Sequence, residues 1–389
     1  MIEADHTRGP KPKQSRRVRE FILGQIRSGL WAPGQVLPAE AELAEQSAVS
    51  QPTVHRELRR LISDGTLAED ASGRRLVAGA AASLMARTIV LLSRFDIGQD
   101  HGQGLERWAS SLDLAVQRQL LAGQWRVFGM HPERLSDANL AQLGSDPPAG
   151  VLLMADELPQ TVTRRLVQAL RRTAVPLVLV GEIESGTADA VSSDQAEGGR
   201  LVARWLAEQG CRRLIAMHRP ESDLPWHEQR QSGHRTGAAE AGLPPPVRCD
   251  MAPSADPSID PASRHAAISS WLADRLRPLC VGGGRIGILG LSDGEVPTLW
   301  GACRRLGLEP GRDVMVSGYD GWWQVLEAER RLEPLPPAVS TDRQYAELAP
   351  VIVRTLVERI AKPAASPRQV RVAPRLIVHP LPTDQGTRP

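Results

Sequence analysis

The sequence is poor in cysteine and aromatic residues, and it has no long apolar run. Its 389 residues include only 4 Cys, at positions 211, 249, 280 and 303, with no C-x-x-C spacing. This pattern argues against a zinc site or a disulfide frame and indicates reduced thiols in a cytoplasmic protein. No apolar stretch approaches the length of a membrane span, and the N-terminus is polar. We therefore expect no membrane span, no signal peptide, no metal and no cofactor.

Lysine is nearly absent as well. The chain has 47 basic and 45 acidic residues, for a formal net charge of +2, and 44 of the basic residues are Arg. Residues 1–27 nevertheless carry seven Arg or Lys against three acids. Such a basic segment is typical of nucleic-acid binding, although a solvated tail and a general preference for arginine have the same composition.

The apolar periodicity of residues 15–79 predicts a small unit of three helices and a hairpin. Ser50 is a good N-cap for the third helix and Gly65 ends it. The apolar stripe of this helix is Val54, Leu58, Leu61 and Ile62. The segment around Ser72-Gly73 then predicts two short strands. Three helices followed by a hairpin define a winged helix-turn-helix, a compact α+β domain.

The exposed side of the third helix has the side chains that read DNA. Gln and Arg can contact base edges in two places at once, and Arg and His neutralise phosphates. The helix taken alone fits a charged solvent face equally well. We predict DNA contacts from residues of this helix and its N-cap and from two arginines at the hairpin tip: Ser50, Gln51, Thr53, His55, Arg56 and Arg59, and Arg74 and Arg75.

The stretch "SGLWAPGQVLPAEAELAEQSAVSQPTVHRELRRLISDGTL" closely resembles the winged helix of the GntR family of bacterial transcription regulators. The shared positions include Pro33-Gly34, Leu37-Pro38 and Glu42-Leu43-Ala44, at fixed spacing over some 40 residues. The resemblance implies a DNA-binding domain. Family members often have Arg where this chain has Gln51 and His55, so the operator sequence does not follow from relatives.

From residue 88 onward, apolar strands alternate with amphipathic helices. This alternation predicts parallel sheets covered by helices on both faces, and the length favours two lobes with a cleft between them. The predicted organisation of the chain is a disordered basic tail (1–14), the winged helix (15–79), a linker (80–87), a two-lobed α/β domain (88–381) and a tail (382–389). Lobe 1 is expected over about 88–191 plus 343–370, and lobe 2 over about 195–339 plus 375–381.

One turn in the second lobe raises the possibility of an enzyme. "GLSDG", residues 290–294, matches the G-x-S-x-G nucleophile elbow of serine hydrolases, with Asp320 and His379 following in the required order. The loop at 101–104, "HGQG", has the composition of an oxyanion loop. A G-x-S-x-G at a strand–helix turn is common by chance, however, and His379 stands in an extended apolar segment. We expect no enzymatic activity.

Residues 88–380 resemble, along their whole length, the effector-binding domain of the LacI/GalR family, which is similar to periplasmic sugar-binding proteins. The resemblance is carried by segments such as "RQSGHRTGAAEAGL", "GILGLSDGEVPTLW" and "VSGYDG". It implies a ligand cleft at the carboxyl ends of the strands, where open α/β sheets bind ligands. The ligand-binding residues that it implies here are Phe95, Asp96, Arg230, Ser292, Asp293 and Asp320.

A chain that pairs a GntR-like DNA-binding domain with a LacI-like effector domain resembles the arabinose-repressor subgroup. They imply a cytoplasmic, dimeric transcription regulator, most simply a repressor, that binds a palindromic double-stranded operator. Its effector would be a small molecule, most plausibly a sugar or sugar derivative. Two alternatives stay open: a serine hydrolase (Ser292, Asp320, His379) fused to a DNA-binding domain, and a regulator whose cleft has lost its ligand.

Overall fold

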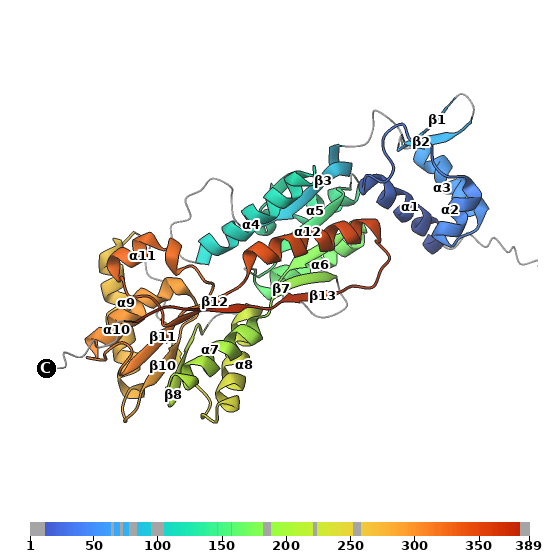
Figure 1. Ribbon diagram of the computed structural model, residues 1–389. Coiled ribbons are helices and arrows are strands. Elements are labelled where there is room, and N and C mark those ends of the chain that lie inside the picture. Colours follow the sequence, from blue (N-terminus) through green and yellow to red (C-terminus); the bar gives the residue numbers. More distant parts are fainter. Residues whose placement is uncertain are drawn as a thin grey trace, which may run out of the picture.

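The computed structural model shows a small helical domain at one end of the molecule, followed by two α/β lobes (Figure 1). It describes residues 12–63, 66–70, 73–77, 84–94, 105–145, 147–156, 158–181, 188–220, 224–251 and 258–381. The predicted site residues Phe95 and Asp96 lie outside the described residues, as do the loop 101–104, the first half of the predicted linker (80–83) and residues 382–389. None of the described helices is long and apolar enough to cross a membrane.

The first domain has the predicted order of three helices and a hairpin. Its elements are α1 (Pro12–Arg27), α2 (Glu40–Ser47), α3 (Gln51–Ser63), β1 (Leu67–Glu69) and β2 (Arg75–Val77). The two strands are antiparallel. Val18 and Ile22 of α1 are fully buried, as are Val54 and Leu61 of α3. Helix α1 begins at Pro12, earlier than the predicted start at residue 15, because proline is favoured in the first turn of a helix. We call this unit the winged helix domain.

Lobe 1 is built around a six-stranded sheet in which every strand pairs in parallel, in the order β13-β7-β6-β5-β3-β4. Its strands are β3 (Thr88–Leu92), β4 (Arg126–Met130), β5 (Gly150–Met154), β6 (Leu177–Val180), β7 (Asp189–Ser193) and β13 (Gln369–Val372). Its helices are α4 (Leu105–Ala122), α5 (Asp137–Ser145), α6 (Gln160–Thr173) and α12 (Tyr345–Ala361). The strands β3, β5 and β6 are buried along their whole length, as expected for a sheet covered on both faces.

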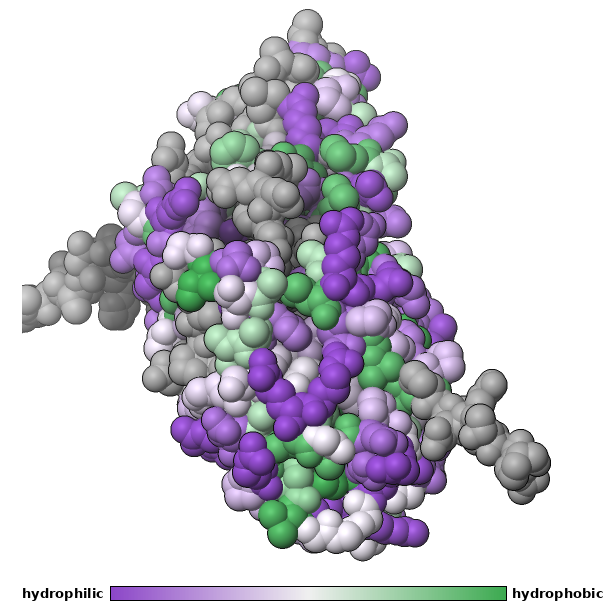
Figure 2. All heavy atoms as spheres, turned by 90° about the vertical axis from the view of Figure 1, so that its left-hand side faces the viewer, coloured by the Kyte–Doolittle hydropathy of each residue, from purple (hydrophilic) through white to green (hydrophobic). Residues whose placement is uncertain are grey.

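Lobe 2 has a second six-stranded sheet, in the order β14-β12-β11-β10-β8-β9. Its strands are β8 (Arg213–His218), β9 (Val247–Asp250), β10 (Ile286–Leu289), β11 (Val314–Ser317), β12 (Val339–Asp342) and β14 (Arg375–Val378). Its helices are α7 (Gln195–Glu208), α8 (Pro225–Glu240), α9 (Pro261–Leu276), α10 (Val296–Arg305) and α11 (Glu327–Leu332). Seen from the side of lobe 2, the apolar side chains on the surface form small separate patches among hydrophilic ones (Figure 2).

The chain crosses between the lobes three times: between β7 and α7, between β12 and α12, and between β13 and β14. The prediction of parallel sheets is confirmed, with one exception. Strand β14 runs antiparallel to β12. The reason is the last crossing, which is only two residues long, so the chain leaves lobe 1 at the carboxyl end of β13 and runs straight on into lobe 2.

The winged helix domain packs directly on lobe 1 through α1 and the C-terminal end of α12 (Figure 1). Gly24 of α1 lies at this contact. A Cβ atom at Gly24 would lie 3.2 Å from the backbone oxygen of Ile360 and 3.8 Å from Pro363 Cδ. The two helices can approach this closely because residue 24 has no side chain.

Candidate functional site

Helix α3 presents its predicted polar side to solvent. Gln51, His55, Arg56 and Arg59 are all exposed, and we call these four residues the reading face. Thr53 is buried, and its hydroxyl lies 2.9 Å from the hydroxyl of Ser50. Ser50 and Thr53 therefore engage each other at the start of the helix, which is the usual role of such residues at an N-terminus. Their DNA contacts stay a prediction.

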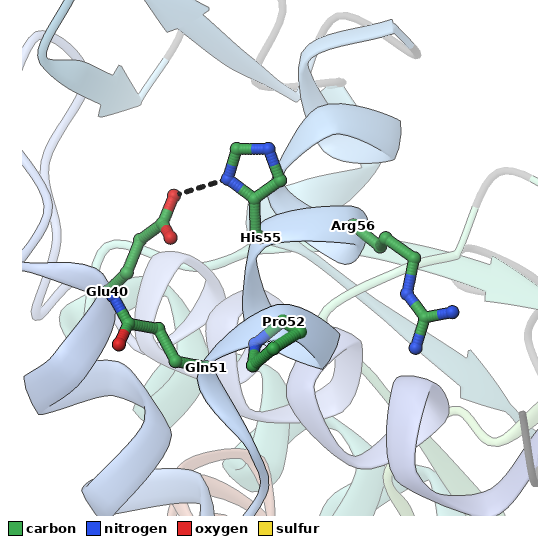
Figure 3. A pocket seen from close by; sticks show the side chains of 5 residues that line it. All are labelled: Glu40, Gln51, Pro52, His55 and Arg56. Carbon is green, nitrogen blue, oxygen red and sulfur yellow. Dashed lines mark hydrogen bonds and ion pairs between the residues drawn. The ribbon is translucent and has the colours of Figure 1, made fainter.

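A shallow hollow lies beside the reading face (Figure 3). It is lined by Glu40, Gln51, Pro52, His55 and Arg56. His55 Nδ1 is 2.9 Å from Glu40 Oε1, and Arg56 extends away from Glu40. The same carboxylate oxygen lies 2.6 Å from Nη1 of Arg75 on strand β2. Glu40 thus joins the helix to the wing, and the sequence analysis did not identify it.

The two arginines of the wing are both engaged with acidic groups. The Arg74 amide donates to Asp70 Oδ1 and its Nε donates to Oδ2, each at 2.9 Å. Arg75 turns back to Glu40. Both guanidinium groups still contribute positive charge next to the reading face. Their predicted contact with the DNA backbone requires them to exchange or share these partners.

A buried carboxylate fixes the other side of α3. Glu57 is 2% exposed and accepts hydrogen bonds from the Ser15 hydroxyl at 2.5 Å, from Arg19 at 3.3 Å and from Arg60 at 3.2 Å. These bonds tie α3 to α1. Arg60 is therefore turned toward α1, although the helical pattern places it next to the reading face.

In lobe 2, Arg230 of α8 is the centre of the predicted ligand site. It is only 2% exposed. Its Nε donates to Gln195 Oε1 at 2.8 Å, Nη1 donates to the Leu291 carbonyl at 2.5 Å, and Nη2 lies 3.1 Å from Asp320 Oδ1. The guanidinium is also stacked between the rings of Trp226 and Tyr319, at 4.3 and 3.6 Å from their centroids. The structure therefore brings Arg230 and Asp320 together, and most of the guanidinium donors are filled by the protein. The ligand contacts of both residues stay a prediction.

A second arginine links this site to lobe 1. Arg343 follows β12 at the second crossing, and its Nη2 donates to Asp156 Oδ2 at 2.5 Å. Its Nη1 is 3.8 Å from Asp320 Oδ1. Asp156 has room only because residue 181 is glycine: a Cβ there, at φ +135°, would lie 2.6 Å from Asp156 Oδ1. Asp156, Arg343, Asp320 and Arg230 form a line of alternating charges across the lobes, which we call the interlobe ion chain.

Ser292 and Asp293 lie at the carboxyl end of β10, as predicted, and both are buried. The Asp293 carboxylate accepts hydrogen bonds from the amides of Trp322 and Trp323, at 2.5 and 3.1 Å, and from the Ser340 hydroxyl at 2.7 Å. Burial raises the pKa of this carboxyl to about 7. Asp293 therefore fixes the position of the turn at 321–323 relative to the end of β10.

The three hydrolase candidates do not meet. The His379 amide pairs with the Ala338 carbonyl beside β12. Strands β12 and β11 stand between β14 and β10, whose carboxyl end leads to Ser292. Three strand spacings separate the two residues by roughly 14 Å. Asp320, in turn, is paired with arginines rather than with histidine. This geometry does not support an acyl-transfer site.

Comparisons with known proteins identify both domains. Residues 14–73 match the family described as bacterial regulatory proteins, gntR family, and residues 203–379 match the periplasmic binding protein-like domain. The molecule is thus a DNA-binding domain of the gntR type joined to a two-lobed domain of the periplasmic-binding-protein type, and both predicted resemblances are confirmed.

Curated relatives include the HTH-type transcriptional repressor PurR of Escherichia fergusonii, which is 25% identical over 247 residues. The match covers 62% of this chain and 65% of that relative. Among solved structures, the transcriptional regulator CelR in complex with cellobiose aligns with a TM-score of 0.56 at 18% identity, over 88% of this chain and 99% of that one. A LacI family regulator from Enterococcus faecium with bound ribose aligns with a TM-score of 0.54 at 18% identity, over 75% and 96%. These structures share the fold.

Proposed function

We propose that the protein is a sequence-specific DNA-binding transcription regulator of the cytoplasm, a repressor, whose operator binding is controlled by a small molecule in the cleft between the lobes. The observation that carries this proposal is the direct packing of α1 on α12. It joins a domain with an exposed, cationic reading face to a domain whose two lobes meet at buried charged groups. The gntR-type match of the first domain and the PurR relatives support the proposal.

We propose a sugar or sugar derivative as the effector. Arg230 and Asp320 have donors and acceptors for hydroxyl groups, which a sugar would engage by displacing the bonds that the two side chains make within the protein. The sugar complexes among the structural neighbours agree with this choice. Ser292 and Asp293 stay proposed ligand-side residues, together with Phe95 and Asp96 on the loop outside the described residues.

Control of DNA binding would pass along α12. The helix has 17 residues, which corresponds to about 25 Å. Its first residue, Tyr345, donates to the Asp320 carbonyl at 3.4 Å and accepts from Trp322 Nε1 at 3.2 Å, so this end is held by lobe 2. Its other end touches Gly24 of α1. A ligand that changes the angle between the lobes would therefore move the surface on which the winged helix domain sits.

The functional unit would be a homodimer on a palindromic operator. Strand β4 is an edge of its sheet, and its Phe128 is 54% exposed. Leu114 and Leu121 of the adjacent helix α4 are 45% and 59% exposed. An edge strand with exposed apolar side chains suits pairing with a second copy of the chain. Two winged helices related by a two-fold axis would then read two half-sites.

The decisive experiment uses the full-length chain and two ligand types. DNA duplexes are selected from a random library, and a panel of sugars and sugar phosphates is screened by thermal shift, because a ligand that binds only the folded state raises the melting temperature. We expect one or a few sugars to raise the melting temperature and to change the affinity for the selected duplex. A chain that enriches no duplex is not a DNA-binding regulator. If DNA binding occurs but no sugar acts, the cleft is non-functional or takes another ligand class. Stoichiometric labelling of Ser292 by a serine-directed phosphonate would instead support the hydrolase alternative.

A further inference from the structure

The hollow beside the reading face contains a carboxylate that contacts an imidazole and a guanidinium with one oxygen atom. Glu40 Oε1 is 2.9 Å from His55 Nδ1 (Figure 3). The same oxygen is 2.6 Å from Arg75 Nη1. We propose that Glu40 is a positioning residue that turns His55 toward DNA and makes operator binding depend on the uptake of a proton. This inference rests on the proposed DNA-binding function.

The orientation of the imidazole follows from its contact with Glu40. An ionised carboxylate only accepts hydrogen bonds, so the Nδ1 of His55 must be the donor in this pair. The other ring nitrogen, Nε2, then stands on the far side of the ring from Glu40. The His55 side chain is 49% exposed and lies on the open reading face. Glu40 therefore fixes which ring nitrogen a nucleic acid meets.

The chemistry at Nε2 depends on protonation. In the neutral ring with its proton on Nδ1, Nε2 is an acceptor, and in the imidazolium it is a donor. Phosphate oxygens and the N7 and O6 atoms of guanine are all acceptors. They form a hydrogen bond with His55 only when the imidazole is protonated. Binding such a DNA atom therefore takes up a proton wherever the free protein is not fully protonated.

The surrounding charges agree with this proton linkage. Among the described residues, the charged groups near His55 are Glu40 on α2, Arg75 on β2, and Arg56 and Arg59 on α3. Glu40 and Arg75 cancel each other, so a phosphate that approaches neutral His55 meets no net charge from these three groups. Protonation of His55 adds a full positive charge at the point of contact, within 2.9 Å of the Glu40 carboxylate.

A matched residue distinguishes this role from a merely structural one. Glu42 lies on the same helix, two residues further on, and accepts a hydrogen bond from Gln46 Nε2 at 3.1 Å. It touches neither His55 nor the wing. Glu42→Gln therefore changes the net charge of α2 by the same amount as Glu40→Gln without affecting the imidazole. The amide of Glu40→Gln keeps the shape of the side chain, so the variant should fold.

The experiment measures the affinity of the full-length chain for the duplex that it selects at pH 6, from pH 5.5 to 8.5 at constant ionic strength. We expect wild-type affinity to fall roughly three- to tenfold between pH 6 and pH 8, as for the uptake of up to one proton. His55→Gln should flatten this pH profile. Glu40→Gln should weaken the pH dependence, because the imidazole is no longer held with Nε2 toward the DNA, and Glu42→Gln should keep the wild-type profile. The wild-type profile in Glu40→Gln would contradict the positioning role. A flat wild-type profile, or the wild-type slope in His55→Gln, would overturn the proposal.

The same measurements distinguish a phosphate from guanine N7 as the DNA atom that His55 contacts. They also distinguish a failure of the Glu40–His55 proposal from a failure of the proposed DNA binding. If Nε2 meets a phosphate, His55→Gln lowers the slope of log affinity against log salt by about one. If it meets guanine N7, replacing one guanine by 7-deazaguanine removes the pH dependence instead. Neither change would overturn the contact. Absence of salt-dependent DNA binding at every pH would contradict the proposed function itself, whereas binding without pH dependence contradicts only the role of Glu40 and His55.

Discussion

Arg343 and Asp156 join the two lobes through a buried ion pair, with 2.5 Å between Nη2 and Oδ2 and side-chain exposures of 2% and 7%. The two residues are 187 positions apart in the chain. Two buried charges are costly to remove from water, and either one becomes costlier still when its partner is lost. The pair therefore stabilises the closed arrangement of the lobes in particular, rather than the fold of either lobe.

The first prediction concerns this pair. Asp156→Asn should weaken closure and increase the radius of gyration of the ligand-free protein, measured by small-angle X-ray scattering. The control is Asp189→Asn, which breaks a buried pair within lobe 1, where Arg359 Nε lies 2.7 Å from Asp189 Oδ2. Asp189→Asn should lose up to about 3–5 kcal/mol of stability, whereas Asp156→Asn should lose less, because separation of the lobes returns Arg343 to water. Only Asp156→Asn should expand the molecule, and an unchanged radius in that variant would contradict the role of the pair.

A second prediction tests the contact between α1 and α12. Gly24→Leu places a side chain against the Ile360 carbonyl, only 3.2 Å from where the Cβ would stand, and should separate the two helices. We expect the operator affinity of the ligand-free variant to stay within about threefold of wild type, a difference of less than 1 kcal/mol. The effector found by thermal shift should no longer change that affinity. Gln14→Leu, at an exposed position of the same helix, is the control. A normal effector response in Gly24→Leu would exclude this route of control.

The reading face supplies a third prediction. Arg56 is exposed and points away from the buried stripe of α3, so Arg56→Ala should leave the fold intact. Its loss should weaken binding to the selected duplex by about 1–3 kcal/mol if it contacts a base. Arg60→Ala is the matched control on the same helix, because Arg60 binds Glu57 and faces α1. Competition with unrelated duplexes measures the specificity, and equal effects of the two substitutions would remove Arg56 from the reading face.

The pH dependence of stability gives a fourth prediction. Asp113 of α4 is 4% exposed and accepts a hydrogen bond from the Ser93 hydroxyl. Burial raises the pKa of its carboxyl to about 7. Between about pH 4 and pH 7 the folded protein therefore holds a proton that the unfolded chain has released, so stability falls as the pH rises through this window.

Asp113→Asn removes this dependence. Urea unfolding at pH 8 should show the variant to be more stable than wild type, by on the order of 1–4 kcal/mol, since one pH unit corresponds to 1.36 kcal/mol. At pH 4.5 most of the difference should vanish, because the folded carboxyl is then protonated and only a small part of the window between pH 4 and pH 7 has been crossed. The same difference at both pH values would contradict the assignment to Asp113.

The sequence predicted what local patterns encode. The stripe Val54, Leu58 and Leu61 located α3 and its exposed side, and apolar runs such as residues 150–154 located the buried strands. Strands β9 and β13 were not predicted from the sequence. They are short and partly exposed, so neither contains an apolar run. These failures concern elements whose position is set by neighbours in the sheet rather than by their own composition.

The candidate sites also contain residues whose position depends on distant parts of the chain and could not be predicted. Arg230 and Asp320 were recognised from segments with a known counterpart, and they meet as expected. Asp156, Arg343 and Glu40 were missed because nothing within a few residues of each marks it as special. Glu40 contacts Arg75 only because the hairpin of the winged helix domain packs against the start of α2. Asp156 contacts Arg343 only because the chain returns to lobe 1 after β12. Ion pairs between distant segments have no signal in a single sequence.

The return of the chain to lobe 1 has a consequence for protein synthesis. The winged helix domain is complete by residue 77, whereas β7 receives its neighbour β13 only when residues 369–372 have been made. At ordinary rates of translation, roughly 15–60 s separate these two events. An interrupted or truncated product would therefore keep the domain that binds DNA while lacking a finished lobe 1 and the helix that links it to the effector. Under the proposed function such fragments would occupy DNA without responding to the effector, so stop codons that fall between the winged helix domain and α12 should be dominant rather than recessive.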